Sequence, residues 1–473
     1  MAVRLKKTEL TQDQISTIRK QLCLIPVEQK SFNPVQNYYS GRDTKESILF
    51  YKIDGQDILL PYYFANVLTG QNTNSFRTFP TTEFTFTGTL RPIQEPVAEE
   101  AVDQLTAFGT TLLAVYPGFG KTVLGAYLSQ WSKLKTLIFY HRSILGQQWQ
   151  STFTECTTAK VWLVEDPEEP EEDYDIVLCM DTQFYKLPKK VTSKIGTVII
   201  DEAHAFCTPS RVECWLGCEP KYVISLTATP DREDEMHSMR QAVCGLHGIY
   251  RVNPNPFTII RFITGITVEC QKNRQGTVDW NHLLNTLCEN EERNSYIIDF
   301  VKNNLEFKIL ILTWRKTHAK LLHSKLNAMG IKTAIMAGTT TSYSDSKVLV
   351  GTISKIGTGF DEKSACQDFG GERINLLLMV GSSKSENVID QTVGRVFRAT
   401  DPYVVFFFDD VPTIKKHYSI FKKWACTPPR NVTIHDMKSA GMISKAKGRI
   451  SKHADVVDAA SEQIDDLIKN GII

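Results

Sequence analysis

Ten short apolar runs, in two groups of five, limit the fold of this 473-residue chain more than any other feature. They consist mainly of β-branched and aliphatic residues without polar alternation, and stretches with helical spacing follow them. The first group is Leu112–Tyr116, Leu137–Tyr140, Ile176–Met180, Val198–Ile200 and Tyr222–Leu226, and the second is Ile309–Trp314, Thr333–Met336, Val348–Val350, Ile374–Val380 and Val404–Phe408. Such runs are typical of strands buried on both faces. The sequence predicts an α/β fold with two parallel-sheet domains in tandem.

The segments around these runs predict further divisions of the chain. An Asp54-Gly55 turn between two apolar runs indicates a hairpin near the start of the chain. We expect a small α+β accessory domain at 1–85, a first α/β domain at 86–250, a linker or start of the second lobe at 251–289, a second α/β domain at 290–425, and a basic tail with a terminal helix at 426–473.

Composition excludes several classes of protein. Lys and Arg number 54 against 53 Asp and Glu, so the chain as a whole is no polycation. Its longest apolar runs fall far short of the roughly 18 residues that a membrane span needs, and no signal-peptide core is present at the start. The 11 cysteines are scattered, unlike a disulfide framework. We expect a soluble, intracellular, reduced protein without a membrane partner.

A glycine-rich segment follows the first expected strand. Gly118-Phe119-Gly120-Lys121-Thr122 lies between that strand and a stretch with helical spacing. Glycines let backbone N–H groups face phosphate oxygens at a helix N-terminus, Lys121 can reach the outer phosphates, and Thr122 can ligate magnesium. Val115 replaces the first glycine of the usual string. A chance glycine turn is the alternative for this segment alone.

Two adjacent carboxylates follow another expected strand. Asp201 and Glu202 come directly after Val198–Ile200, and the carboxyl ends of buried strands are where α/β sheets bind ligands. Asp201 is placed to hold magnesium, and Glu202 to orient or deprotonate an attacking water. Alone, the pair could be an acidic strand end with a helix cap. Together with the lysine loop, it predicts nucleoside triphosphate hydrolysis.

These segments, with others in the same order, resemble the ATPase core of superfamily 2 helicases over about residues 88 to 410. The resemblance implies two RecA-like domains, ATP and Mg²⁺ as cofactors, and nucleic acid as a partner. It also implies roles in the first half of the chain: Arg91 and Gln94 contact adenine, Pro117 belongs to the phosphate loop, Gln148-Trp149 and Thr182 contact the nucleic-acid strand, and His204, Thr227 and Thr229 couple hydrolysis to movement.

Two further motifs lie in the second half. Gly357–Asp361 is similar to the fifth motif, which implies that Thr358 contacts nucleic acid and that Gly359 and Asp361 act in coupling. Gln391–Arg398 matches Q-x-x-G-R-x-x-R, and Gln391, Arg395 and Arg398 are its catalytic residues. Arginines three apart share one helix face, and arginines from another domain can neutralise transferring phosphate. Surface arginines on a solvated helix are the alternative.

Within the superfamily, the chain resembles the XPB and UvsW branch, and most closely the compact helicases of large DNA viruses, of the poxvirus transcript-release type. This implies an ATP-dependent DNA helicase or translocase in viral transcription or DNA metabolism, with DNA favoured over RNA. Transcription or replication machinery would be its partner, in the host cytoplasm or the virion. The alternatives are a motor that translocates without separating strands, as a subunit of a larger complex, and a low-turnover ATP-dependent clamp.

Two other features have open interpretations. Residues 411–453 carry ten Lys or Arg, interleaved with Tyr418, Phe421 and Trp424. This pattern suits a phosphate backbone and stacked bases, and a packing helix with lysine stems is the alternative. Cys207, Cys214 and Cys218 could in principle hold zinc or an iron–sulfur cluster, but buried reduced thiols are the favoured interpretation.

Overall fold

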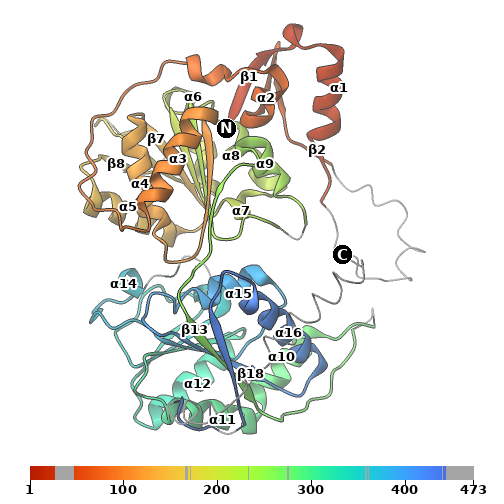
Figure 1. The fold of residues 1–473 in the computed structure, drawn as a ribbon, viewed down its shortest axis with the longest axis vertical. Coiled ribbons are helices and arrows are strands. Elements are labelled where there is room, and N and C mark those ends of the chain that lie inside the picture. Colours follow the sequence, from red (N-terminus) through yellow and green to blue (C-terminus); the bar gives the residue numbers. More distant parts are fainter. Residues whose placement is uncertain are drawn as a thin grey trace, which may run out of the picture. The chain divides into compact units, whose positions relative to one another are not determined.

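The computed structural model describes residues 1–26, 47–165, 169–170, 172–232, 234–273, 276–356, 360, 362–438 and 440–443. Contacts divide the chain into two compact units (Figure 1). The first unit comprises Met1–Pro254 with Gly357–Ser364 and Asn387–Phe397, and the second comprises Asn255–Ile356, Ala365–Glu386 and Arg398–Ile473.

A seven-stranded parallel sheet forms the centre of the first unit, in the order β12-β6-β11-β10-β7-β9-β8. Its strands are β6 (Thr110–Val115), β7 (Thr136–Tyr140), β8 (Val161–Leu163), β9 (Ile176–Met180), β10 (Thr197–Asp201), β11 (Tyr222–Thr227) and β12 (Ile249–Arg251). The five strands predicted for this region are present, and β8 and β12 are additional.

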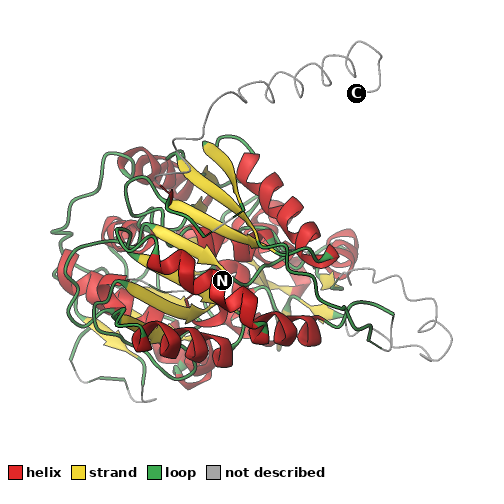
Figure 2. Cartoon of the chain, turned by 90° about the horizontal axis from the view of Figure 1, so that it is seen from below, coloured by secondary structure: helices red, strands yellow, loops and turns green. Residues whose placement is uncertain are grey.

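Helices cover both faces of this sheet (Figure 2). On one face lie α3 (Glu95–Phe108), α4 (Lys121–Ser132) and α5 (Ser143–Cys156), and on the other α6 (Lys189–Thr192), α7 (Ala203–Phe206), α8 (Val212–Leu216) and α9 (Ser238–Cys244). In β10, Ile199 packs into the first layer, whereas Val198 and Ile200 pack into the second. Burial on both faces explains why the strand shows no polar alternation.

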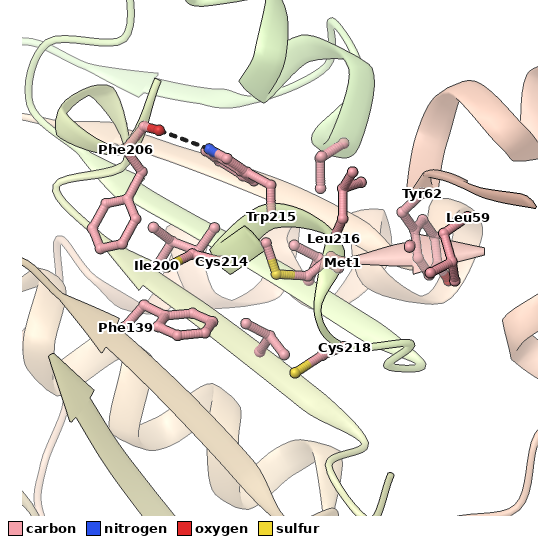
Figure 3. Packing of buried hydrophobic residues seen from close by; sticks show 14 of the residues in the cluster. Met1, Leu59, Tyr62, Phe139, Ile200, Phe206, Cys214, Trp215, Leu216 and Cys218 are labelled. Carbon is pink, nitrogen blue, oxygen red and sulfur yellow. Dashed lines mark hydrogen bonds between the residues drawn. The ribbon is translucent and has the colours of Figure 1, made fainter. Parts of the chain in front are cut away.

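The N-terminal segment is α+β, as predicted, and it shares its core with the first parallel sheet. Its elements are β1 (Ala2–Lys6), η1 (Lys7–Glu9), α1 (Gln12–Gln21), β2 (Cys23–Leu24), β3 (Ile48–Leu49), β4 (Lys52–Asp54), β5 (Asp57–Pro61), α2 (Tyr62–Thr69) and η3 (Thr73–Phe76). Strands β1, β5 and β4 form an antiparallel sheet. Met1 and Leu59 belong to one hydrophobic cluster with Phe139 of β7 and Trp215 of α8 (Figure 3). This N-terminal segment, residues 1–85, which we call the leader, is therefore part of the first unit.

The second unit is built on another seven-stranded parallel sheet, in the order β15-β16-β14-β17-β18-β13-β19. Its strands are β13 (Phe257–Ile263), β14 (Ile309–Thr313), β15 (Thr333–Met336), β16 (Val348–Thr352), β17 (Leu376–Met379), β18 (Tyr403–Phe408) and β19 (Val432–Met437). Helices α11 (Glu291–Lys302) and α12 (Lys316–Ala328) pack on one face. On the other lies α16 (Pro412–Cys426), with α10 (Trp280–Glu289) against it.

The chain also contains three short helices, α13 (Ile353–Ile356), α14 (Glu362–Ala365) and α15 (Glu386–Val393). Two 3₁₀ turns, η4 (Asp181–Lys186) and η5 (Pro209–Arg211), belong to the first unit. Among the helices of the described ranges, none combines the length and the apolar character needed to cross a bilayer.

Residues 251–289 are the start of the second lobe, one of the two alternatives that the sequence predicts, because their strand β13 pairs in parallel with β18 and β19. The second unit ends later than the sequence predicts, since β19 extends its sheet past residue 425. Tyr418, Phe421 and Trp424 are buried on α16, where Tyr418 and Phe421 contact Phe406 of β18. The packing alternative is correct for these aromatic residues. The terminal helix expected in 426–473 lies outside the described residues.

We expect Leu60→Ala to destabilise the parallel sheet of the first unit as well as the leader, because Leu60 is fully buried in their shared core. Removing a buried leucine side chain typically costs about 2–5 kcal/mol. Amide hydrogen exchange should therefore rise in β7 and β10. Leu49→Ala is the matched control, since that leucine is exposed. Faster exchange confined to the leader would contradict a shared core.

Candidate active site

The site is set by the order of four neighbouring parallel strands. Strand β11 lies between β6 and β10, and β7 follows on the far side of β10. The register pairs Asp201 with Leu226 and Thr227 with Ala114. Because the strands are parallel, the segments that leave their carboxyl ends meet at one edge of the sheet. The glycine-rich loop, the acid pair and the segment after Thr227 are therefore neighbours.

The glycine-rich loop has the backbone that phosphate binding requires. Gly118 and Gly120 adopt φ angles of +85° and +92°, and Gly120 caps α4, whose first residue is Lys121. A Cβ atom at position 120 would lie 2.4 Å from Nε2 of Gln94, so both conformation and space demand glycine there. The loop thus brings Lys121 and Thr122 to the start of a 12-residue helix, where backbone N–H groups favour anions.

Arg91 and Gln94 donate hydrogen bonds to carbonyl oxygens of this loop. Gln94 is buried, and its Nε2 donates to the carbonyl oxygens of Phe119 at 3.0 Å and Gly120 at 3.3 Å. Arg91 donates to the carbonyl oxygen of Gly118 at 3.1 Å and also to that of Phe119. Both residues therefore lie against the phosphate loop. Their contact with adenine stays a prediction.

The acid pair is held by a small hydrogen-bond network. Asp201 is 6% exposed; its Oδ2 accepts from the indole Nε1 of Trp149 and its Oδ1 from the backbone N–H of Glu202, both at 3.0 Å. Glu202 adopts φ 52° and ψ 52°, a left-handed conformation that costs a non-glycine residue about 1–2 kcal/mol. The left-handed conformation ends the extended backbone of β10, so the Glu202 side chain does not continue the alternation of side chains along that strand.

Burial and nearby charges shift the pKa values of the two carboxylates in opposite directions. Burial raises the pKa of Asp201 to about 6, and the Glu202 charge adds to this effect. Burial also opposes ionisation of Glu202, but Lys121, followed by His204, outweighs it and lowers the pKa of Glu202 below its ordinary value. Glu202 is therefore an anion at neutral pH, in the state in which it can accept a proton.

His204 joins the acid pair to the segment after β11. Its Nδ1 lies 2.9 Å from Oγ1 of Thr227, and the same hydroxyl accepts from the backbone N–H of Thr229 at 3.0 Å. Arg232 donates to the carbonyl oxygen of His204 at 2.9 Å. His204 therefore contacts Thr227, and the role of His204, Thr227 and Thr229 in coupling stays a prediction.

Arg395 also belongs to this site within the first unit. A Cβ atom on the preceding Gly394 would lie 2.6 Å from Cβ of Pro117 in the phosphate loop. Burial lowers the pKa of Arg395 to about 10 while the Glu202 charge opposes the shift, so its guanidinium remains a cation at neutral pH. Its Nε donates to the carbonyl oxygen of Gln391 at 3.1 Å.

The expectation that Arg395 and Arg398 share one helix face is wrong. Helix α15 ends at Val393, and both arginines lie in the turns that follow. Gly394, directly after the helix, is the signal that could have located this end. Gln391 lies on the helix itself. The predicted sites Thr358, Gly359 and Asp361 lie outside the described residues.

Trp149 is not placed as a nucleic-acid contact. Its side chain is fully buried and reaches Asp201 from α5. Leu145, Trp149 and Phe153 are spaced by four residues and are all buried, and this helical spacing is the signal that could have placed the ring inside. Gln148 is half-buried and Thr182 is exposed on η4, so their strand contacts stay predictions.

The cysteine cluster has the character of core thiols. Cys207, Cys214 and Cys218 are buried and unbonded to one another, and burial raises their pKa values to about 11, 12 and 12. Within the part of the chain that the structure describes, no group of three His, Cys, Asp or Glu side chains is arranged to hold a metal. The oxygen donors of Thr122 and Asp201 suit Mg²⁺, which is typically bound by one or two protein groups together with substrate phosphates.

The comparisons with known proteins agree with this geometry. The family model of the type III restriction enzyme res subunit matches residues 87–232. "Putative helicase 161L" of Invertebrate iridescent virus 6 is 29% identical over 380 residues, 73% of this chain and 83% of that protein. "Putative helicase 055L" of Frog virus 3 is 29% identical over 336 residues, 69% of this chain and 75% of that protein.

The chain is therefore similar to putative helicases of large DNA viruses and, over residues 87–232, to the res subunit family. This similarity supports a nucleic-acid-dependent ATPase of the helicase or translocase type. A solved fragment of "a putative HsdR subunit of a type I restriction enzyme" from Vibrio vulnificus has a TM-score of 0.53 at 17% identity, covering 76% of this chain and 70% of that one. The fold prediction of two RecA-like domains is confirmed.

We expect Gly120→Ala to weaken ATP binding at least about tenfold, because its methyl group would meet Gln94 and its φ of +92° is unfavourable. Gly55→Ala is the control, since Gly55 also has a positive φ but open space around it. Titration with a fluorescent ATP analogue measures both. Equal affinity in the two variants would contradict the role given to the loop.

Proposed function

We propose that this protein is a superfamily 2 helicase that couples ATP hydrolysis to movement along DNA, or to its unwinding, in viral transcription or DNA metabolism. The observation that supports the proposal is the joint placement of Lys121, the acid pair and Arg395 around one sheet edge. Carboxylates and cations whose pKa values are shifted by burial together with specific charged neighbours are typical of functional sites.

Each group has a role in hydrolysis. Lys121 and the loop backbone hold the phosphates, and Arg91 and Gln94 contact the adenine. Thr122 and Asp201 would ligate Mg²⁺, which when bound neutralises phosphate charge. Glu202 orients the attacking water and accepts its proton. Arg395 neutralises the charge that spreads over the transferring phosphoryl group, and Gln391 and Arg398 of the same motif are proposed to assist in catalysis.

The coupling segment supports a motor more than a simple hydrolase. Thr227 accepts one bond from the backbone of its own loop and contacts His204 beside Glu202. Two hydrogen bonds thus connect His204, whose Nδ1 lies 3.4 Å from Oε2 of Glu202, to Thr229, and we expect a change at the acid pair to be passed along them. Gln148, Thr182 and Thr358 are the proposed strand contacts, and Gly359 and Asp361 complete the coupling set.

The substrate and setting are inferred from the relatives. The relatives include putative helicases of Invertebrate iridescent virus 6 and Frog virus 3 and a putative ATP-dependent RNA helicase of a mimivirus. Our proposal is DNA rather than RNA as the substrate, with the transcription or replication machinery as partner, in the host cytoplasm or the virion. The match to the res subunit of a restriction enzyme supports a second candidate, the motor subunit of a larger complex that translocates without separating strands. A strand-displacement assay beside a triplex-displacement assay distinguishes them, because only unwinding releases the duplex strand.

We expect Glu202→Gln to lower the ATP turnover number at least about 100-fold with little change in ATP affinity, because general-base catalysis typically contributes 10²–10⁴-fold. Glu99→Gln should retain full turnover, since Glu99 is an exposed carboxylate on α3. Phosphate release by each purified variant measures the effect. Wild-type turnover in Glu202→Gln would overturn the assignment.

A further inference from the structure

Trp149 is a buried hydrogen-bond donor aimed at the acid pair. Its indole Nε1 lies 3.0 Å from Oδ2 of Asp201, and its side chain has no exposed surface. An indole N–H can only donate, and a buried donor without an acceptor is unfavourable. Breaking the hydrogen bond between the Trp149 ring and the Asp201 carboxylate is therefore unfavourable.

Both oxygens of Asp201 are held in place. Oδ2 accepts from Trp149, and Oδ1 accepts from the backbone N–H of Glu202 at 3.0 Å. Rotation of the carboxylate would break at least one of these bonds. Because an ionised carboxylate has about four lone-pair sites, the two bonds orient the group and leave each oxygen able to ligate a cation.

The ring is itself fixed by the phosphate-loop helix. A Cβ atom at Gly125 of α4 would lie 2.4 Å from Cη2 of Trp149 and 3.1 Å from Cζ3, so the helix backbone packs directly on the indole. Phe153, which also lies on α5, stacks on the Trp149 ring with ring centroids 5.9 Å apart. Trp149 therefore touches the helix that begins with Lys121 and Thr122, and also the carboxylate that completes the cation site.

A second buried tryptophan shows that the fold does not need an acid to satisfy an indole. Trp215 of α8 is equally buried, and its Nε1 donates to the backbone carbonyl oxygen of Phe206 at 2.9 Å (Figure 3). If Trp149 only filled the core, a backbone carbonyl could accept its indole N–H, as Phe206 does for Trp215. Trp149 instead uses the carboxylate proposed to ligate Mg²⁺, and its neighbour Gln148 is a proposed strand contact.

We propose that Trp149 is a positioning residue for Mg²⁺: it holds Asp201 in the orientation in which the carboxylate and Thr122 ligate the ion, and it joins helix α5 to that site. The inference rests on the proposed role of Asp201. Outer hydrogen-bond partners of metal ligands orient them and typically change metal affinity or activity 10- to 100-fold when lost.

The test uses Mn²⁺ as the probe, with a non-hydrolysable ATP analogue and the full chain. Electron paramagnetic resonance counts free Mn²⁺ directly, so the measurement does not depend on turnover. Trp149→Phe should weaken Mn²⁺ binding about tenfold or more and leave binding of the analogue in metal-free buffer unchanged. Trp215→Phe removes an equally buried indole donor away from the acid, and its Mn²⁺ affinity should stay within about twofold of wild type.

Asp201→Asn separates failure of this inference from failure of the proposed site. If wild type binds Mn²⁺, Asp201→Asn loses it and Trp149→Phe matches wild type, the positioning role is overturned and the site stands. If wild type and Asp201→Asn bind Mn²⁺ equally, both are overturned. Should Trp149→Phe not fold, Gly125→Ala keeps the indole but displaces the ring. The same loss of Mn²⁺ affinity is expected there, and wild-type affinity would overturn the role.

Discussion

The parallel pairing of β10 with β11, and of β11 with β6, is the constraint on which the rest of the site depends. It brings the phosphate loop, the acid pair and the Thr227 segment to one sheet edge although more than a hundred residues separate Lys121 from Thr227. Each group sits at the end of a strand whose two faces are buried, so the scaffold holds its position rigidly. The site thus needs few contacts of its own to stay assembled.

Electrostatics then give the groups different tasks. Asp201 and Glu202 are adjacent and buried, yet the pKa of Asp201 is raised and that of Glu202 is lowered, because Lys121 and His204 favour the Glu202 anion. The Asp201 carboxylate is tied down by two donors, whereas Oε2 of Glu202 lacks a hydrogen-bond partner among the described residues. A fixed acid suits a cation, and a carboxylate with a spare acceptor suits a water.

Much of the fold could be predicted because buried parallel strands leave apolar runs that read directly from the sequence. The exceptions have physical causes. Strands β8 and β12 have three residues each, which are too few to show a pattern. In β13 the charged residue Arg261 interrupts the apolar run, and it forms an ion pair with Asp436 of β19. The motifs predict an ATP site, and the structure brings Lys121 and the acid pair together at one sheet edge. The motif match alone does not show that Trp149 points inward, although the four-residue spacing of Leu145, Trp149 and Phe153 indicates it.

Hydrolysis of ATP in response to nucleic acid is the activity that we propose for this site. The decisive measurement is steady-state hydrolysis by the purified chain, alone and with single-stranded DNA, duplex DNA and RNA of equal nucleotide concentration. We expect strong stimulation by at least one polymer, greatest with DNA. An ATP turnover that none of the three polymers changes would contradict it.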